Sequence, residues 1–130
     1  MRIEGLSFQE EGLPWRATRV EGVSWLPLWQ EEGAQGRAGG RARGGAAVLI
    51  RMAAGCGYAP HRHIGTEDVL VLQGGYEDQF GVHRAGEFVH YAAGTEHAPR
   101  ALGDPRATGR DSLACVLYAI VPQGIELLER

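Results

Sequence analysis

Three histidines and one glutamate in the middle of the chain constrain its fold more than any other feature. His61 and His63 are two residues apart, so on a β-strand both imidazoles leave the same face. Glu67 follows after three further residues, which is room for a tight bend that returns its carboxylate to that face. His97 comes from a distant part of the chain. Imidazole and carboxylate groups are common metal ligands, so this spacing predicts a β-strand fold that gathers the four side chains around one ion.

Short apolar segments separated by glycine, proline and aspartate predict an all-β chain. The segments are rich in Val, Leu, Ile, Tyr and Trp, and no long helical periodicity appears. We expect turns at residues 74–75 and 78–81. Many short antiparallel strands at this spacing predict a sandwich or a barrel. The strands are expected at residues 15–20, 23–30, 46–52, 58–63, 68–73, 76–80, 87–91, 97–101 and 112–121.

Length and composition predict one domain over residues 1–130. A chain of 130 residues lies in the commonest range for a single domain and can bury an adequate core. The formal net charge of −3 does not favour binding to nucleic acid or to an anionic membrane surface. We find no apolar run long enough for a transmembrane helix and no signal peptide at the start. We therefore expect a cytoplasmic protein with Cys56 and Cys115 as free thiols that pack in the interior.

The region around the histidines resembles the two motifs of the cupin superfamily. The first motif is glycine, five residues, His-x-His, three or four residues, glutamate, six residues and glycine, and its fixed positions are here Gly55, His61, His63, Glu67 and Gly74. In the second motif, the glycines and the histidine correspond to Gly86, Gly94 and His97. Ala92 and Ala101 replace the usual proline and asparagine, and neither departure removes a ligand. The resemblance implies a double-stranded β-helix, the cupin jelly roll, with its metal ligands at His61, His63, Glu67 and His97.

A narrower resemblance, over about residues 15–121, is to the cupin domain of ChrR-type anti-sigma factors. It rests on the segments 25–28, 49–52, 67–74 and 76–78. In that family the cupin domain contains zinc and takes part in sensing oxidative stress. A complete anti-sigma factor also has an amino-terminal helical domain, so we expect a cupin module here and not a whole anti-sigma factor. The same group of small cupins is similar to acetylacetone-cleaving dioxygenases, which use iron.

The ligand set leaves two functions open. Three histidines and one glutamate complete a tetrahedral shell around zinc, which fits a sensing or binding module. An octahedral ion such as iron or manganese, held by the same side chains, keeps two positions free for a small organic molecule and O₂. We expect one divalent ion, zinc in preference to iron, manganese or nickel. We rank a sensing or binding module before a dioxygenase that acts on a small diketone-like molecule.

Other polar residues do not decide between these functions. The polar candidates for orienting a small-molecule ligand are Tyr58, Arg51, Tyr118 and Glu96. Glu96 is the neighbour of His97, and neighbours on a strand face opposite ways, which argues against its being a ligand. We interpret His83 and His90 as structural or surface residues. The segment 33–45, which includes Arg37, Arg41 and Arg43, and the segment 103–111 are expected to be surface loops.

Two tryptophans suggest a covered strand and a dimer. In the segment 25–29, alternation places Trp25 and Trp29 on one face and the two leucines on the other. A half-exposed strand would alternate with polar residues, so we expect this strand to be covered on both sides. The segment 68–72 has the same character after its acidic start. Since cupins commonly pair through β-strands, the resemblance implies a homodimer.

Overall fold

The described part of the chain consists almost entirely of short strands. The structure is a computed structural model, and it describes residues 1–31 and 41–127. The only helix within these ranges is a 3₁₀-helix, Gly109–Ser112. The strands are Arg16–Ala17 (β1), Val23–Gln30 (β2), Arg41–Arg43 (β3), Ala46–Met52 (β4), His61–His63 (β5), Glu67–Gln73 (β6), Gly75–Asp78 (β7), Gly81–Arg84 (β8), Phe88–Tyr91 (β9), Glu96–His97 (β10), Arg100–Ala101 (β11), Cys115–Val121 (β12) and Gly124–Leu127 (β13).

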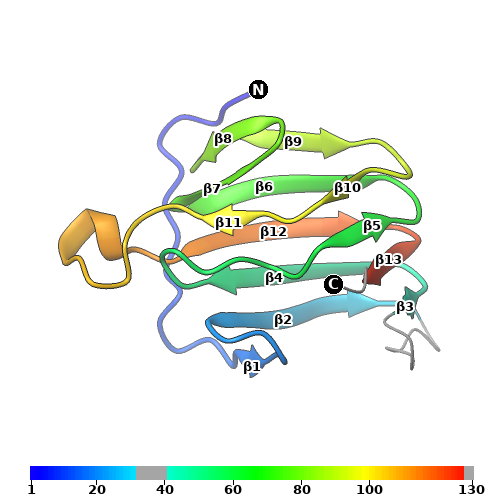
Figure 1. Cartoon of the computed structure of the whole chain (residues 1–130), viewed down its shortest axis with the longest axis horizontal. Coiled ribbons are helices and arrows are strands. Elements are labelled where there is room, and N and C mark those ends of the chain that lie inside the picture. The colour runs from blue at the N-terminus through cyan, green and yellow to red at the C-terminus, as the bar shows by residue number, and fades with distance from the viewer. Residues whose placement is uncertain (32–40, 128–130) are drawn as a thin grey trace.

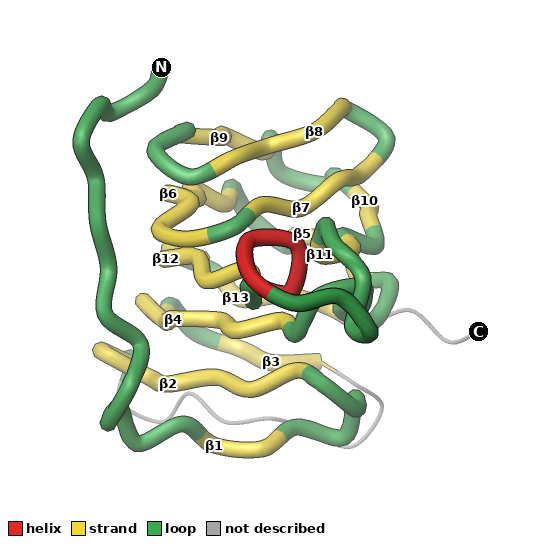
Figure 2. Tube along the Cα trace, turned by 90° about the vertical axis from the view of Figure 1, so that its left-hand side faces the viewer, coloured by secondary structure: helices red, strands yellow, loops and turns green. Residues whose placement is uncertain are grey.

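These strands form two packed layers (Figure 1). One layer is a six-stranded sheet in the order β1-β2-β4-β12-β6-β9. The other layer contains a four-stranded sheet, β10-β5-β13-β3, and a three-stranded sheet, β11-β7-β8. Figure 2 shows the large sheet on one side and the shorter strands on the other. The arrangement confirms the all-β jelly-roll class that the sequence predicts.

Most predicted strands are present, but one is divided. The predicted strand 97–101 is two strands, because β10 pairs with β5 while β11 pairs with β7 in a different sheet. Pro99 lies between them and has no N–H to continue a ladder. The turn expected at 78–81 connects β7 to β8, which the sequence did not predict. The strands β3 and β13 were also missed.

The predicted loops are only partly confirmed. Residues 32–40, which include Arg37, lie outside the described residues. The rest of the segment 33–45 is not all loop, because β3 pairs with β13 over residues 41–43. The segment 103–111 is irregular up to residue 108 and then enters the 3₁₀-helix.

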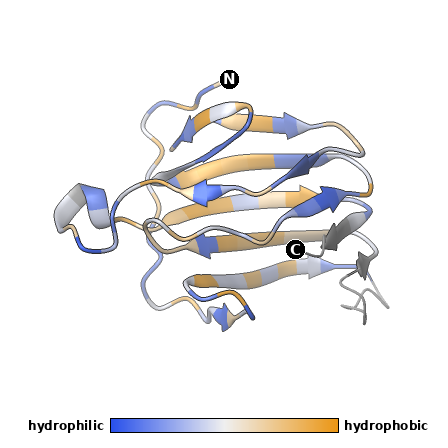
Figure 3. Ribbon diagram, viewed as in Figure 1, coloured by the Kyte–Doolittle hydropathy of each residue, from blue (hydrophilic) through white to orange (hydrophobic). Residues whose placement is uncertain are grey.

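The core lies between the two layers. Alternate residues of the large sheet turn inward, and Figure 3 shows its long strands as mainly hydrophobic. Tyr76 from β7 and Tyr91 from β9 complete the core, with exposed fractions of 1% and 3%. The other buried core residues are Val23, Val48, Met52, Val69, Val71, Ala101, Cys115, Leu117 and Ala119.

A β-bulge corrects the prediction that Trp25 and Trp29 share one face. Trp25 pairs with Ile50, but the register of β2 against β4 shifts between Pro27 and Trp29, so that Trp29 pairs with Ala47. Ile50 faces the interior, and Ala47 is three residues before it on β4, so Ala47 faces outward. Trp29, which pairs with Ala47, therefore also faces outward. Trp29 is 58% exposed. The strand is therefore not covered on both sides along its whole length.

The outer face of the large sheet carries one apolar row. The row crosses five strands in register, and its side chains lie on the same face. Phe88 at one end is 41% exposed, whereas Leu49 within the row is buried. The row consists of Leu26, Leu49, Tyr118, Leu70 and Phe88. No helix of the described residues is long and apolar enough to span a membrane.

The amino-terminal segment crosses the outside of the large sheet from β9 to β1 (Figure 2). The Ile3 N–H donates to the Gly86 carbonyl at 2.6 Å, and the Phe88 N–H donates to the Met1 carbonyl at 2.9 Å. Gly86 has a φ of +92°, and a Cβ at this position would lie 2.6 Å from the Ile3 carbonyl oxygen. The motif glycine therefore permits both a left-handed backbone and a close chain contact.

Candidate metal centre

The four predicted ligands converge at one place inside the sandwich. His61 and His63 belong to β5, Glu67 begins β6, and His97 ends β10. Pairing of β10 with β5 places His97 directly opposite His61. All four side chains are buried, and one ligand atom from each lies within 4.8 Å of the others. The four residues that the spacing and the family motifs predicted as ligands thus come together.

The imidazoles approach each other through the same ring nitrogen. His61 Nε2 lies 3.1 Å from His63 Nε2 and 3.0 Å from His97 Nε2. A carboxylate oxygen of Glu67, Oε1, lies 3.0 Å from His63 Nε2 and 3.9 Å from His97 Nε2. The three Nε2 atoms and this oxygen therefore form a compact cluster of donor atoms.

Hydrogen bonds on the far side of two rings fix their tautomers. His61 Nδ1 lies 2.9 Å from the Ala59 carbonyl oxygen, and His97 Nδ1 lies 3.0 Å from Asp78 Oδ2. Both oxygens only accept, so each Nδ1 carries the proton and each neutral ring presents an Nε2 lone pair to the cluster. Two lone pairs 3.0 Å apart repel each other unless a cation lies between them. This arrangement fits a metal ion.

His63 is anchored differently from the other two histidines. Its Nδ1 is the one buried nitrogen or oxygen among the described side chains that has no hydrogen-bond partner. Its ring is held instead by Nε2, beside Glu67, and by aromatic packing against Tyr91 at a centroid distance of 5.3 Å. The side chain is 0% exposed.

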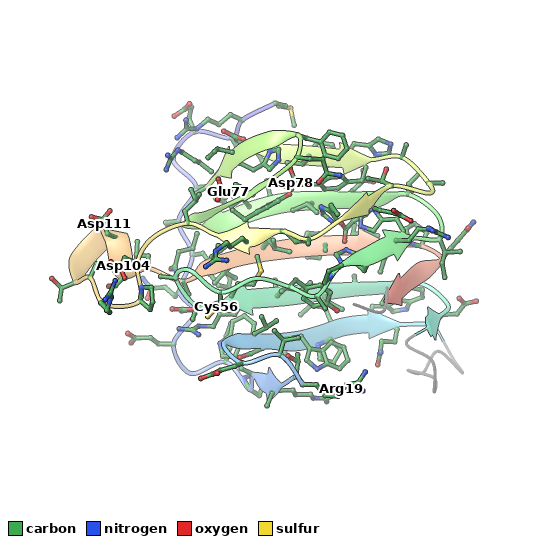
Figure 4. The ribbon with its side chains drawn as sticks, viewed as in Figure 1. Arg19, Cys56, Glu77, Asp78, Asp104 and Asp111 are labelled. Atoms are coloured by element: carbon green, nitrogen blue, oxygen red, sulfur yellow. The ribbon has the colours of Figure 1, made fainter. Side chains whose placement is uncertain are left out.

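A buried carboxylate that the sequence did not single out supports the cluster. Asp78, labelled on β7 in Figure 4, has a side chain that is 0% exposed. Its Oδ2 accepts from His97 and from the Tyr91 hydroxyl, which lies at 2.6 Å. Its Oδ1 accepts from His83 Nε2 and the Phe80 N–H, each at 3.0 Å. Carboxylates that hold a histidine by Nδ1 are common around metals.

The network continues to Tyr76. The Tyr91 hydroxyl proton is directed to Asp78, so the Tyr76 hydroxyl donates to Tyr91 at 2.6 Å. Tyr76 and Asp78 are two apart on β7, and His83 lies opposite Tyr76 on β8. This alternation of polar residues was the sequence signal for the network. It was missed because Asp78 was interpreted as part of a turn, and the strand expected at 76–80 was given no role at the site.

The electrostatics favour neutral imidazoles beside an ionised carboxylate. Burial lowers the pKa of His61 to about 4 and also lowers the pKa of His97. Both rings are therefore neutral at pH 7, which is the form that binds a metal. Burial alone would raise the pKa of Asp78, but hydrogen bonds from Tyr91, His97 and His83 lower it below its ordinary value.

Of the four other polar candidates, only Tyr58 lies in the interior cavity. Tyr118 belongs to the outer apolar row, because it pairs with Leu49 and Leu70. Arg51 donates to Glu10 in the amino-terminal segment at 2.8 Å. Glu96 is exposed and forms an ion pair with Arg62, as expected for a neighbour of His97 that faces outward.

The remaining histidines and cysteines match their predicted structural roles in part. His90 is exposed and lies 2.6 Å from Asp68. His83 is structural, but it contacts Asp78 and is therefore part of the support of the candidate centre. Both cysteines are free, but Cys56 is only half-buried, so the expectation that both pack in the interior holds for Cys115 alone. Cys115 is 0% exposed, and burial raises the pKa of its thiol to about 12, which leaves it protonated.

An interior cavity of about 350 Å³ adjoins the candidate centre. His61, Glu67 and His97 line it, whereas His63 does not. The walls come mainly from the inward faces of β2, β4, β6 and β12, with Tyr58 and Pro99 on the opposite side. A ligand in the cavity would therefore lie beside three of the four candidate metal ligands.

Comparison with known proteins places these features in a family. Residues 4–108 match the model of the ChrR cupin-like domain. Among curated proteins, no sequence matches the chain. A crystal structure of Rhodobacter sphaeroides SigE in complex with the anti-sigma ChrR is similar over 87% of this chain and 51% of the matched chain, with 26% identity and a TM-score of 0.65. The chain thus spans about half the length of that relative.

Two dioxygenase structures share the fold. The acetylacetone dioxygenase from Acinetobacter johnsonii is 14% identical and is similar over 83% of this chain and 64% of its own, with a TM-score of 0.63. A putative acetylacetone dioxygenase from Methylibium petroleiphilum is also 14% identical and is similar over 99% of this chain and 84% of its own, with a TM-score of 0.68. At this identity the likeness shows the fold alone.

Proposed function

We propose that this chain, which belongs to the ChrR cupin-like family, is a small module that binds one divalent metal ion and serves in sensing or binding. The metal ligands are His61, His63, Glu67 and His97. The observation that supports this proposal is the buried cluster of three Nε2 atoms and one carboxylate oxygen within 4.8 Å of one another. Zinc is favoured, because three imidazoles and one carboxylate complete its tetrahedral shell.

Metal analysis of untagged protein tests the site. We expect one zinc ion per chain in the wild type and a large loss of zinc in His97→Ala. His90→Ala is the matched control, since His90 is an exposed histidine with a carboxylate partner outside the cluster. Equal zinc content in His97→Ala and the wild type would contradict the assignment. The melting temperature should fall with the metal content, because the ion binds the folded site and not the unfolded chain.

The sensing role predicts a response to oxidant. Treatment of the zinc-loaded protein with hydrogen peroxide or singlet oxygen should release zinc, which a chromophoric chelator detects. Cys56→Ser and Cys115→Ala separate thiol oxidation from oxidation of the imidazoles. Retention of zinc and of structure at oxidant doses that modify histidine and cysteine would oppose a sensing role.

The second candidate function is an iron-dependent dioxygenase. The specific support is the cavity, which reaches three of the four candidate ligands. An octahedral ion held by four side chains keeps two positions for a bidentate oxygen ligand or for a ligand and O₂. Iron-loaded protein given a β-diketone should then consume O₂, and His63→Ala should abolish the uptake. If the fully iron-loaded protein takes up no O₂, the dioxygenase function is ruled out and the sensing or binding module remains.

We also propose that the module is a cytoplasmic homodimer that pairs through the outer apolar row. The row contains no charged side chain, so two copies that face each other bring apolar groups and the Tyr118 hydroxyl together along it, while Arg51 and Asp68 lie beside the row. A different protein covering this face would leave the isolated chain monomeric. Sedimentation of the purified protein decides between these two occupants.

A further inference from the structure

The chemistry of the interior cavity restricts what it can hold. Apart from His61, Glu67 and His97, the lining residues within the described part of the chain carry no charge. The wall opposite the centre is built from aliphatic side chains, including Ile50, Leu117 and Ala119. A charged group moved into such surroundings loses its hydration without gaining a partner. The cavity therefore disfavours phosphorylated, carboxylated and amino-acid-like ligands except at the centre itself.

Most polar groups that line the cavity are already occupied. The Thr18 hydroxyl donates to the carbonyls of Val20 or Val23, at 3.1 and 2.9 Å. The Tyr76 hydroxyl donates to Tyr91. Gln30 is exposed, at the end of β2. These groups add little specificity for the oxygen atoms of a ligand.

Tyr58 is the exception. It lines the cavity next to the candidate centre, and its ring is 5.0 Å from the ring of His61 in an edge-to-face arrangement at 88°. Among the side chains and backbone groups that the structure describes, its hydroxyl has no hydrogen-bond partner. A phenol is protonated at neutral pH and can donate one hydrogen bond. A donor without a partner in an apolar cavity beside a metal-binding cluster is well placed to bind a ligand oxygen.

We propose that the cavity binds an uncharged, mainly apolar small molecule that carries a carbonyl or enol oxygen, with this oxygen at the metal centre and hydrogen-bonded to the Tyr58 hydroxyl. This inference rests on the proposed metal site. A cavity of about 350 Å³ corresponds to about a dozen water volumes of ~30 Å³ each, so the ligand has about a dozen non-hydrogen atoms.

Three probes with one chelating head and different bodies test the proposal. Acetylacetone is small, benzoylacetone adds an aromatic ring, and acetopyruvate adds a carboxylate. Binding to the manganese-loaded chain is followed by calorimetry and by tryptophan fluorescence, to which Trp25 in the cavity lining contributes. Manganese is used because an octahedral ion held by four side chains keeps positions free for the chelating head, whereas a zinc shell of four ligands is complete. We expect benzoylacetone to bind at least about tenfold more tightly than acetylacetone, because its ring buries more apolar surface. Acetopyruvate should bind more weakly than benzoylacetone.

Two variants separate the oxygen contact from the apolar wall. Tyr58→Phe should weaken benzoylacetone binding by about three- to tenfold, the worth of one hydrogen bond, and should leave binding of naphthalene unchanged. Tyr118→Phe is the matched control on the outer face. Ala119→Leu should fill part of the cavity and reduce the affinity for benzoylacetone and naphthalene. Melting temperature and zinc content show whether each variant is folded.

The outcomes distinguish this inference from the proposed function. If the chain binds zinc but the three diketones bind equally, or acetopyruvate binds best, the ligand class is wrong and the metal site stands. If the chain binds no zinc, the proposed function fails and the oxygen contact at the centre fails with it. If naphthalene still bound to that metal-free protein, the only part of the inference left standing would be that the cavity is apolar. An unchanged benzoylacetone affinity in folded Tyr58→Phe would remove Tyr58 from the site.

Discussion

Replacing Asp78 by asparagine tests how the protein positions its candidate metal ligands. The carboxylate accepts four hydrogen bonds, two on each oxygen, and its side chain is 0% exposed. Asparagine has the same shape but offers an NH₂ group in place of one oxygen. If that group faced His97 and Tyr91, it would meet two donors. The less unfavourable orientation directs it toward His83, whose ring can accept at Nε2 after changing tautomer, but it leaves the Phe80 N–H without an acceptor.

In that orientation His97 keeps an acceptor but loses the negative charge. A hydrogen bond to a charged group is worth about 1 kcal/mol more than a neutral one, and about 1.4 kcal/mol corresponds to a factor of ten. We therefore expect Asp78→Asn to lower zinc affinity by about fivefold. Asp78→Ala leaves several buried donors without an acceptor, so its zinc affinity should fall by about a hundredfold, with a clear loss of stability.

Competition with a chromophoric chelator at pH 7.5 measures the affinity, and the visible spectrum of the cobalt-loaded protein reports the geometry. Asp68→Asn is the matched control, because Asp68 is also a strand aspartate hydrogen-bonded to a histidine, His90, but on the outer surface. A merely structural role for Asp78 would lower the melting temperature without moving the cobalt spectrum. Zinc affinity equal to that of the wild type in folded Asp78→Asn would refute the reasoning.

Three further predictions concern pH, backbone conformation and assembly. The pKa of His61 is about 4 in the folded chain and about 6.5 in the unfolded chain, so the unfolded state binds more protons below pH 6.5. The metal-free protein should therefore lose about 3 kcal/mol of stability as the pH falls from 6.5 to 4. Urea titrations measure this loss, and His61→Asn should reduce it. Gly74→Ala should destabilise the fold by more than Gly109→Ala. Both glycines have φ near +70°, but only at Gly74 would a Cβ lie 2.7 Å from a carbonyl oxygen, which belongs to Ala114. Equal melting temperatures for the two variants would contradict this prediction. If the outer row is the dimer interface, Leu70→Lys should give a monomer by sedimentation, whereas Val82→Lys on β8 should not.

The sequence predicted the candidate centre better than it predicted the strands around it. His61, His63 and Glu67 come together through the period-two alternation of β5 and the turn before β6, which are local properties readable from spacing. His97 was identified from the family motif, and the pairing of β10 with β5 brings it to the other three. The motif glycines also have local causes, such as the positive φ of Gly86. Local geometry of this kind is written in the sequence.

Other features depend on partners that the sequence does not name. The bulge in β2 arises from the register against β4, so alternation alone gave the wrong face for Trp29. The division of 97–101 follows from pairing with two different strands. The hydrogen bond from His97 to Asp78 could not be predicted, because it depends on how β7 is placed relative to β10. These are tertiary relations, and no pattern within one segment reports them.

The position of the cavity connects the two candidate functions. His61, Glu67 and His97 line the cavity, so a ligand in it contacts three of the candidate metal ligands. By linkage, a ligand that prefers the metal-loaded protein raises metal affinity by the same factor as the metal raises ligand affinity. In a zinc module, this coupling makes the metal occupancy depend on whether the ligand is bound. It also makes ligand binding depend on whether the centre holds its metal. In an iron enzyme the same contact presents the ligand for oxidation. The apolar cavity suits both roles, and the metal's redox chemistry is what separates a sensor from a catalyst.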